Sequence, residues 1–182
     1  NPCGVSSKNN YLESYKSALL CDPISAFGGI VSLNFKVNRN LAVELNKIFL
    51  EVIIANGFDK NAIKILKSKK NLRLIDGTNF SLNKILKFIS FNQEILVQTE
   101  DLDVFTKNSF KVVSKRKPTS KQLRDLIFAF NVCRHVKSNA IVLASNETTV
   151  GIGSGQPSRL DSCQIAINKM KKFNLKTDNL VA

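Results

Sequence analysis

The sequence contains one histidine, no tryptophan and no pair of cysteines at the Cys-x-x-Cys spacing. His135 has no second histidine to share a zinc ion with, and no Cys or His pair stands at metal-ligand spacing, so we expect no metal. A Ser-His-Asp triad would have to use His135, and no nucleophile-elbow motif accompanies it. The scattered cysteines fit reduced thiols better than a disulfide framework: Cys3, Cys21, Cys133 and Cys163.

Long apolar runs are also missing. The longest, residues 52–55 and 140–144, have the length of strands, far below the roughly 20 residues of a membrane span. No signal peptide is visible, so we expect a cytoplasmic protein that does not enter a membrane. A chain of 182 residues with 43% hydrophobic and 23% charged residues is typical of one globular domain or two small subdomains.

The net charge of +13 allows three interpretations. Clustered lysines and arginines can neutralise nucleic-acid phosphates, a basic surface can attract small anionic substrates, and a lineage rich in Lys, Asn and Ile can carry extra charge without a role. Because the lysines are spread along the chain, a solvated surface is favoured and nucleic acid is an unlikely partner. A basic nucleic-acid-binding module remains the alternative function, and a stand-alone small-molecule-binding domain a third.

In the first hundred residues, apolar strands alternate with amphipathic helices, which predicts an α/β layered fold. Asp22-Pro23 ends the first helix, and Asp59 is the expected cap of the third, whose inward residues are Ala62, Ile65 and Leu66. The expected helices are residues 7–20, a helix marked by residues 41–49, and one after Asp59; the expected strands are a turn and strand over 26–33, then 52–55, 72–75 and 95–98.

The sequence pattern changes over residues 101–118, and we place a subdomain boundary there. Within this stretch, residues 110–114 are expected to form a strand. Thr119 and Gln122 have capping-box spacing at the start of a helix. Strands over 140–145 and 149–152 are joined by Asn146-Glu147, and a glycine-rich loop leads into a last helix. The expected inward residues are Leu123, Leu126, Ile127 and Phe130 in the first of these helices, and Leu160, Cys163, Ile167 and Met170 in the last.

Three segments have the character of sites, and each has a structural alternative. In residues 22–29 two glycines let backbone approach a ligand, and Phe27 can stack on a flat ring; the alternative is a tight turn. In residues 137–140, Asn139 can present an amide donor and an acceptor; the alternative is a helix C-cap. Residues 153–159 offer backbone N–H groups, a helix start and Arg159, the ingredients of an anion site, or else a structural turn.

Six segments, in this order, resemble the AICAR formyltransferase family, where AICAR is aminoimidazole carboxamide ribotide. Each motif is weak alone, but the ordered set is specific and covers essentially the whole chain. The segments are NPCGV (1–5), DPISAFGGI (22–30), EVIIA (51–55), KNLRL (70–74), KSNAIV (137–142), and GIGSGQ with Ser158-Arg159 (151–159).

The resemblance implies a cytidine-deaminase-like layered α/β fold, duplicated in the family and lacking the deaminases' zinc. Residues 1–108 would be the first subdomain, truncated at its N-terminus, and residues 109–182 a linker helix and the start of the second, truncated at its C-terminus. The implied reaction moves a formyl group from the cosubstrate 10-formyltetrahydrofolate to the 5-amino group of AICAR during IMP biosynthesis. The intact enzyme would be a homodimer that also has IMP cyclohydrolase activity.

Carried over by position, the resemblance gives six roles to five side chains and one glycine. Phe27 and Gly28 would border AICAR, while Glu51, Asn139 and Arg159 would contact it, Asn139 as the catalytic residue. The last is Leu160, near the folate. The family's catalytic Lys-His pair lies just upstream of the position of Asn1, so we expect this chain alone to be inactive. His135 falls in a helical stretch and is expected to pack or to lie at a solvated helix end.

Overall fold

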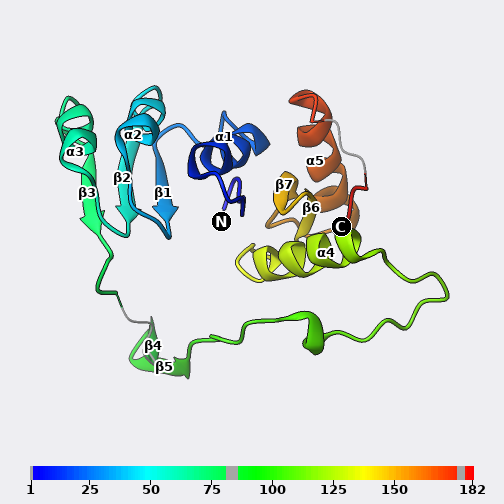
Figure 1. The fold of residues 1–182 in the computed structure, drawn as a ribbon. Coiled ribbons are helices and arrows are strands. Elements are labelled where there is room, and N and C mark those ends of the chain that lie inside the picture. Colours follow the sequence, from blue (N-terminus) through cyan, green and yellow to red (C-terminus); the bar gives the residue numbers. More distant parts are fainter. Residues whose placement is uncertain (1, 81–85, 176–178) are drawn as a thin grey trace.

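The computed structural model describes residues 2–80, 86–175 and 179–182, and it confirms an α/β fold. Asn1, the first residue of the NPCGV segment, lies outside the described residues. Helices and strands gather in two groups, with a long extended segment running between them (Figure 1). The elements of the first group are α1 (Tyr11–Cys21), β1 (Gly29–Leu33), α2 (Arg39–Leu45), β2 (Leu50–Ala55), α3 (Lys60–Leu66) and β3 (Arg73–Asp76).

A three-stranded parallel sheet in the order β1-β2-β3 organises the first group. The two crossovers contain α2 and α3, which pack against each other and beside the sheet. Parallel strands need such crossovers, and helices then cover the sheet. The core between these layers is made of fully buried aliphatic side chains, among them Leu41, Leu45, Leu50, Ile53 and Leu66.

The second group is a two-stranded antiparallel sheet held between two helices. Its elements are α4 (Ser120–Cys133), β6 (Ile141–Ser145), β7 (Thr148–Gly153) and α5 (Arg159–Lys172). The expected turn joins the strands, and both Asn146 (φ 53°) and Glu147 (φ 50°) have the positive φ of a type I′ hairpin turn. The buried carboxylate of Asp125 accepts hydrogen bonds from both of their backbone N–H groups, at 3.0 and 2.7 Å, so α4 fixes the turn.

Strand β7 lies directly on the backbone of α5. A Cβ added to Gly151 would lie 2.2 Å from the carbonyl oxygen of Ala166, and one added to Gly153 would lie 1.8 Å from that of Ser162. The Gly-x-Gly spacing at this strand is therefore a packing requirement. Only the third glycine of the series, Gly155, has open space around it and a positive φ of 67°.

Helix α1 joins the two groups. Tyr15 belongs to the first core, whereas Cys21 packs with side chains of α4, β6 and β7. The segment before α1 also reaches the second group, because Val5 N–H donates to Thr149 Oγ1 at 2.9 Å and Thr149 N–H donates to Val5 O at 2.9 Å. The division into residues 1–108 and 109–182 stays a prediction.

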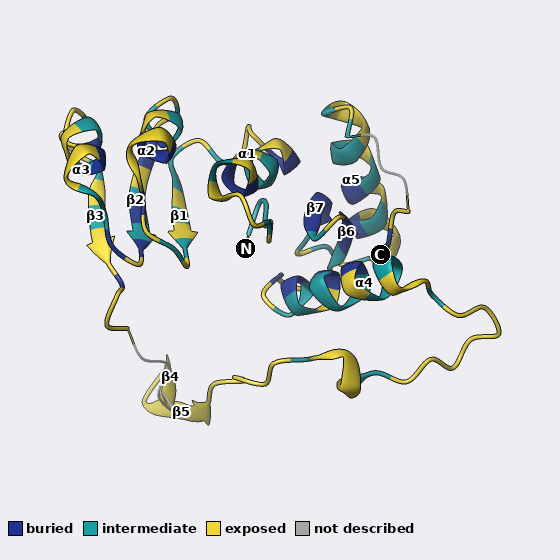
Figure 2. Cartoon of the chain, viewed as in Figure 1, coloured by how far each residue is buried: buried dark blue, intermediate teal, exposed yellow. Residues whose placement is uncertain are grey.

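Between the two groups lie the β4–β5 hairpin and the extended segment that follows it. β4 (Leu86–Phe91) pairs with β5 (Glu94–Thr99), and a single short helix, η1 (Lys107–Ser109), interrupts the extended segment. Figure 2 shows that the hairpin is exposed throughout, whereas buried residues concentrate in the two groups. Within the described ranges, no helix has the length and apolar character needed to cross a membrane.

Several local expectations are wrong. Residues 110–114 form no strand, because no strand among the described residues pairs with them. The sequence also missed strand β4, which precedes the expected strand over 95–98. Helix α2 stops at Leu45, before Ile48 and Phe49. Asp59 stands at the N-cap of α3, and Ala62 and Leu66 are buried, but the Asp59 side chain pairs with Lys36 at 3.0 Å and makes no capping bond.

The inward faces of the two long helices are confirmed in part: Leu126 of α4 and Ile167 and Met170 of α5 pack against buried clusters, but Phe130 and Leu160 do not lie inward. The buried residues of α4 are Asp125, Ala129 and Val132; Phe130 is 45% exposed and meets the extended segment instead. The buried residues of α5 are Ser162 and Ala166, while Leu160 is 80% exposed. The capping box of α4 is confirmed: Thr119 Oγ1 accepts from Gln122 N–H at 3.2 Å and Gln122 Oε1 from Thr119 N–H at 3.0 Å.

Candidate functional site

The turn between α1 and β1 is built on Asp22. Its Oδ1 accepts the backbone N–H of Ser25 at 3.0 Å, and its carbonyl oxygen accepts the N–H of Ala26 at 3.2 Å. The turn ends at Gly28, whose φ of 71° is one that side chains rarely adopt and whose N–H donates to Phe49 O at 2.9 Å. These contacts hold the turn against the start of β2.

Three of the predicted site residues meet at this turn. A Cβ on Gly28 would lie 3.9 Å from Glu51 Oε1 and 3.7 Å from the ring of Phe49, so Glu51 is beside the turn. Phe27 is 72% exposed, and its ring centroid lies 5.3 Å from that of Phe49. An exposed ring next to an exposed carboxylate can stack on a flat heterocycle and accept hydrogen bonds from its substituents.

Asn139 lies two residues before β6, with its side chain directed at the loop before α5. Its Nδ2 donates to the carbonyl oxygens of Gln156 and Pro157, at 3.0 and 2.8 Å, and its own carbonyl oxygen accepts from Ser162 Oγ at 2.7 Å. Both amide hydrogens are therefore used within the protein. The acceptor Oδ1 is the atom of this side chain that remains for a ligand.

The glycine-rich loop uses part of its own donor capacity. Gly155 N–H donates to Lys137 O at 2.7 Å, and Ser158 Oγ caps α5 by accepting from Leu160 N–H at 3.1 Å. The positive group that this end of α5 still presents is Arg159, an exposed guanidinium on the first residue of the helix. Leu160, next to it, offers an exposed apolar side chain.

The structure thus forms two clusters, one of Phe27, Gly28 and Glu51, and one of Asn139, Arg159 and Leu160. Among the residues that the structure describes, no hydrogen bond, ion pair or ring contact joins one cluster directly to the other. His135 is exposed near the end of α4 and belongs to neither.

An ion pair connects the elements that carry the two clusters. Lys169 Nζ, on α5, lies 2.6 Å from Asp22 Oδ2, whose side chain is 4% exposed. Burial alone would raise the pKa of the Asp22 carboxyl, but the hydrogen bonds from Lys169 and Ser25 outweigh it and lower that pKa below its ordinary value of 3.8. Asp22 therefore stays charged and ties the turn before β1 to α5.

Sequence reasoning missed Phe49, Lys169 and Ser162. Phe49 was expected in the helix marked by residues 41–49. Ile48 and Phe49 directly precede β2, however, and two consecutive apolar residues in that position are also consistent with a helix that has already ended. No sequence signal marks Lys169 or Ser162, because their partners lie 147 and 23 residues away along the chain. Within residues 2–80, 86–175 and 179–182, no group of His, Cys, Asp and Glu side chains is arranged to hold a metal ion.

Comparisons with known proteins give one consistent result. The family profile described as AICARFT/IMPCHase bienzyme matches residues 1–169. The chain is similar to the bifunctional purine biosynthesis protein PurH of Persephonella marina, 46% identical over 100% of the chain and 35% of that relative. The PurH proteins of Rhodospirillum rubrum and Caldicellulosiruptor bescii are 49% and 48% identical, over 91% and 97% of the chain and 32% and 34% of each relative.

The chain spans about a third of the length of the curated relatives it matches. These matches do not favour the alternative of a basic nucleic-acid-binding module.

Proposed function

The chain belongs to the AICARFT/IMPCHase bienzyme family, and from this we propose that it forms part of an enzyme of purine biosynthesis that formylates AICAR. The formyl donor in this proposal is 10-formyltetrahydrofolate. The observation that carries the proposal is the family match over residues 1–169, which includes both clusters.

Catalysis of this reaction depends more on the positioning of the two substrates than on reactive side chains. The amine nitrogen of AICAR bonds to the formyl carbon, the bond from that carbon to N10 of the folate breaks, and the amine proton ends on N10. The amine is a weak nucleophile because its lone pair is delocalised toward the ring and carboxamide. Holding it against the formyl carbon is therefore a large part of the catalytic task.

The first cluster supplies a surface for the flat aminoimidazole ring. Phe27 presents its exposed ring for stacking, and Gly28, which has no side chain, lets a ligand approach the backbone beside that ring. Glu51, at the edge of this surface, accepts hydrogen bonds from N–H or hydroxyl groups of AICAR. The Phe27–Phe49 contact supports this role, because it restricts the ring of Phe27 before the substrate arrives.

The second cluster supplies a fixed acceptor and a positive charge. Because Nδ2 of Asn139 is held by Gln156 and Pro157, its Oδ1 is oriented before the ligand binds and accepts an N–H of the amine or carboxamide. Arg159 attracts the anionic ribotide, and Leu160 provides apolar surface for the folate.

Binding by the 182-residue chain is the direct test of the AICAR surface. We expect AICAR to shift the backbone amide NMR signals of Gly28 and Glu51, and Phe27→Ala to weaken this binding. His135→Phe is the matched control because His135 is exposed and lies outside both clusters. Shifts confined to other parts of the chain would contradict the assigned surface.

Turnover is tested in a chimaera in which this chain replaces the matching region of the Persephonella marina relative. We expect AICAR-dependent release of tetrahydrofolate, a decrease of about a hundredfold in kcat for Asn139→Ala, and mainly an increased KM for AICAR for Arg159→Ala. Circular dichroism of each protein verifies the fold. A folded chimaera without formyl transfer, or a larger loss for His135→Phe than for Asn139→Ala, would refute the proposal.

A further inference from the structure

The two clusters lie on different groups of the fold, although AICAR would have to touch both. The first cluster stands at the amino ends of β1 and β2, whereas Asn139 and Arg159 belong to the second group. No hydrogen bond, ion pair or ring contact between their described residues sets the distance from one cluster to the other. Because a misplacement of about 1 Å can cost about a hundredfold in rate, a site built from both clusters needs another part of the chain to hold them in place.

One face of α5 reaches toward both clusters. Ser162, Ala166 and Lys169 are four and three residues apart, so they follow one another along the same side of the helix. Ser162 and Ala166 are fully buried, and their carbonyl oxygens lie against the two glycines of β7. A Cβ at either glycine would overlap those oxygens. Helix α5 is therefore seated directly on β7 and has little freedom to move along it.

The near end of this face holds Asn139. Ser162 Oγ donates to the backbone carbonyl oxygen of Asn139 at 2.7 Å, and Asn139 N–H donates to Gln156 O at 3.1 Å. The side chain of Asn139 is held by the same loop, which leads into α5. The acceptor Oδ1, the atom that this side chain leaves for a ligand, thus has a position that is set relative to α5.

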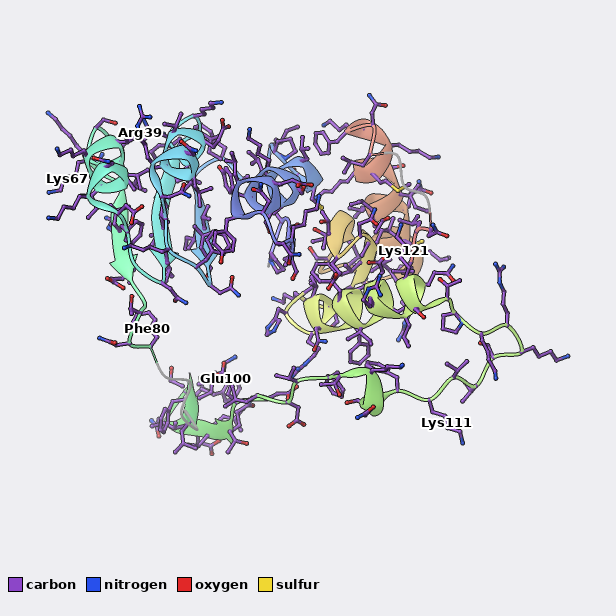
Figure 3. All side chains as sticks on the ribbon, viewed as in Figure 1. Arg39, Lys67, Phe80, Glu100, Lys111 and Lys121 are labelled. Carbon is purple, nitrogen blue, oxygen red and sulfur yellow. The ribbon has the colours of Figure 1, made fainter. Side chains whose placement is uncertain are left out.

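The far end of this face holds the turn of the first cluster. Lys169 lies seven residues farther on, about 10 Å along the helix, and its Nζ is 2.6 Å from Asp22 Oδ2. By contrast, Lys67 at the end of α3 is exposed and projects away from the rest of the chain (Figure 3). The other oxygen of the Asp22 carboxylate accepts the N–H of Ser25 at 3.0 Å, inside the turn that presents Phe27. One carboxylate therefore orders the turn and binds α5 at the same time.

We propose that α5 is a spacer that fixes the position of the first cluster relative to the second, with Ser162 and Lys169 as its two positioning residues. Neither touches the substrate: Ser162 acts through Asn139, and Lys169 acts through Asp22. Apolar side chains in place of a buried ion pair are often as stable or more so, so stability alone does not account for this pair. The inference rests on the proposed function for its substrate, but the spacing belongs to the chain and can be measured without AICAR.

Residual dipolar couplings of the backbone amides test the spacer in the 182-residue chain without substrates. These couplings report whether β1–β3 and the second group keep one orientation relative to each other. In the wild type, both sets should fit a single alignment tensor. Lys169→Met should require two tensors, because the turn before β1 is released from α5. Lys171→Met is the matched control, because it removes the same charge from an exposed position of the same helix.

Two more variants separate positioning from folding. Asp22→Asn breaks the same ion pair but keeps an oxygen for the N–H of Ser25, so it is the milder change and should also require two tensors. Lys169→Arg keeps the positive charge and should restore the single tensor. Where Lys169→Met does not fold, Asp22→Asn decides. A single tensor for a folded protein without the ion pair would overturn the proposal, and so would two tensors for the wild type or for Lys171→Met.

Turnover in the chimaera tests what the spacing does for catalysis. Lys169→Met should lower kcat/KM for AICAR by about ten- to a hundredfold. Ser162→Ala should lower kcat by about three- to tenfold and leave KM unchanged, because it loosens Asn139 alone. Lys171→Met should match the wild type. Equal kinetics for Lys169→Met and Lys171→Met would overturn the spacer. A folded wild-type chimaera without formyl transfer would instead refute the proposed function, and the dipolar couplings would still decide on the spacer.

Discussion

Replacing the two partners of the Lys169–Asp22 ion pair one at a time should have unequal costs. Lys169→Met leaves the Asp22 carboxylate charged in a position where its side chain is 4% exposed. Asp22→Asn leaves Lys169, whose side chain is 35% exposed and can regain water, and it keeps an oxygen for the N–H of Ser25. Lys169→Met, which leaves a buried carboxylate without its partner, should therefore destabilise the fold more than Asp22→Asn.

The structure sets the size of each effect. Breaking a buried pair costs about 3–5 kcal/mol, and the partial exposure of Lys169 reduces this, so Lys169→Met should lower the free energy of unfolding by about 2–4 kcal/mol. Asp22→Asn loses one charged hydrogen bond and should cost about 1–2 kcal/mol. Urea unfolding at neutral pH, followed by far-ultraviolet circular dichroism, measures both values, and the double variant gives the coupling between the residues.

The same ion pair predicts how the stability of the fold changes with pH. Since the folded protein lowers the pKa of Asp22 from its ordinary value of 3.8, the pair stabilises the fold above that value and the contribution is lost as the pH falls below it. The stability difference between wild type and Asp22→Asn should stay constant from neutral pH to about 5 and then shrink. Equal costs for the two single variants, or a difference that grows in acid, would refute this account of the pair.

Three further predictions concern packing and hydrogen bonds, each measured by urea unfolding. Gly153→Ala should cost about 3 kcal/mol or more because its Cβ would overlap the carbonyl oxygen of Ser162, whereas Gly155→Ala should cost only the about 1–2 kcal/mol of a positive φ; equal costs would contradict the packing role. Asp125→Ala should cost about 3 kcal/mol, since it leaves two backbone N–H groups of the β6–β7 turn without their acceptor, and an unchanged midpoint would show that the turn forms without it. Tyr15→Phe should stabilise the fold by up to about 1 kcal/mol, because the buried hydroxyl has no hydrogen-bond partner among the described residues; a clear loss of stability would show that a water or an undescribed residue satisfies it.

Local signals predicted the local structure well. The Thr119–Gln122 capping box, the end of α1 at Asp22-Pro23 and the Asn146-Glu147 turn each depend on neighbouring residues, and each is confirmed. Periodicity failed where a distant segment decides which side of a helix is buried. Phe130 follows the apolar pattern of α4, yet it packs edge-on against two phenylalanines of the extended segment, with centroid distances of 5.0 and 5.2 Å.

The same limit applies to the candidate site. The types of residue in each cluster could be read from short motifs, because Phe27 and Gly28 are adjacent and Asn139 stands just before a strand. The partners of Asn139 could not, because Gln156 and Pro157 come from a loop 17 and 18 residues farther along. Which atom of Asn139 remains for a ligand depends on those contacts, so only the folded structure gives it.

The attachment of the segment before α1 to β7 has a consequence for synthesis on the ribosome. Val5 and Ser6 find their partners in Thr149 and Thr148, 144 and 142 residues later, and β6 in turn pairs with Val181. At about 5–20 residues per second, translation of that interval takes roughly 7–30 s. During this delay Val5 and Ser6 lack their strand, and the faces of α1 that later meet β7 stay open to chaperones and to neighbouring nascent chains.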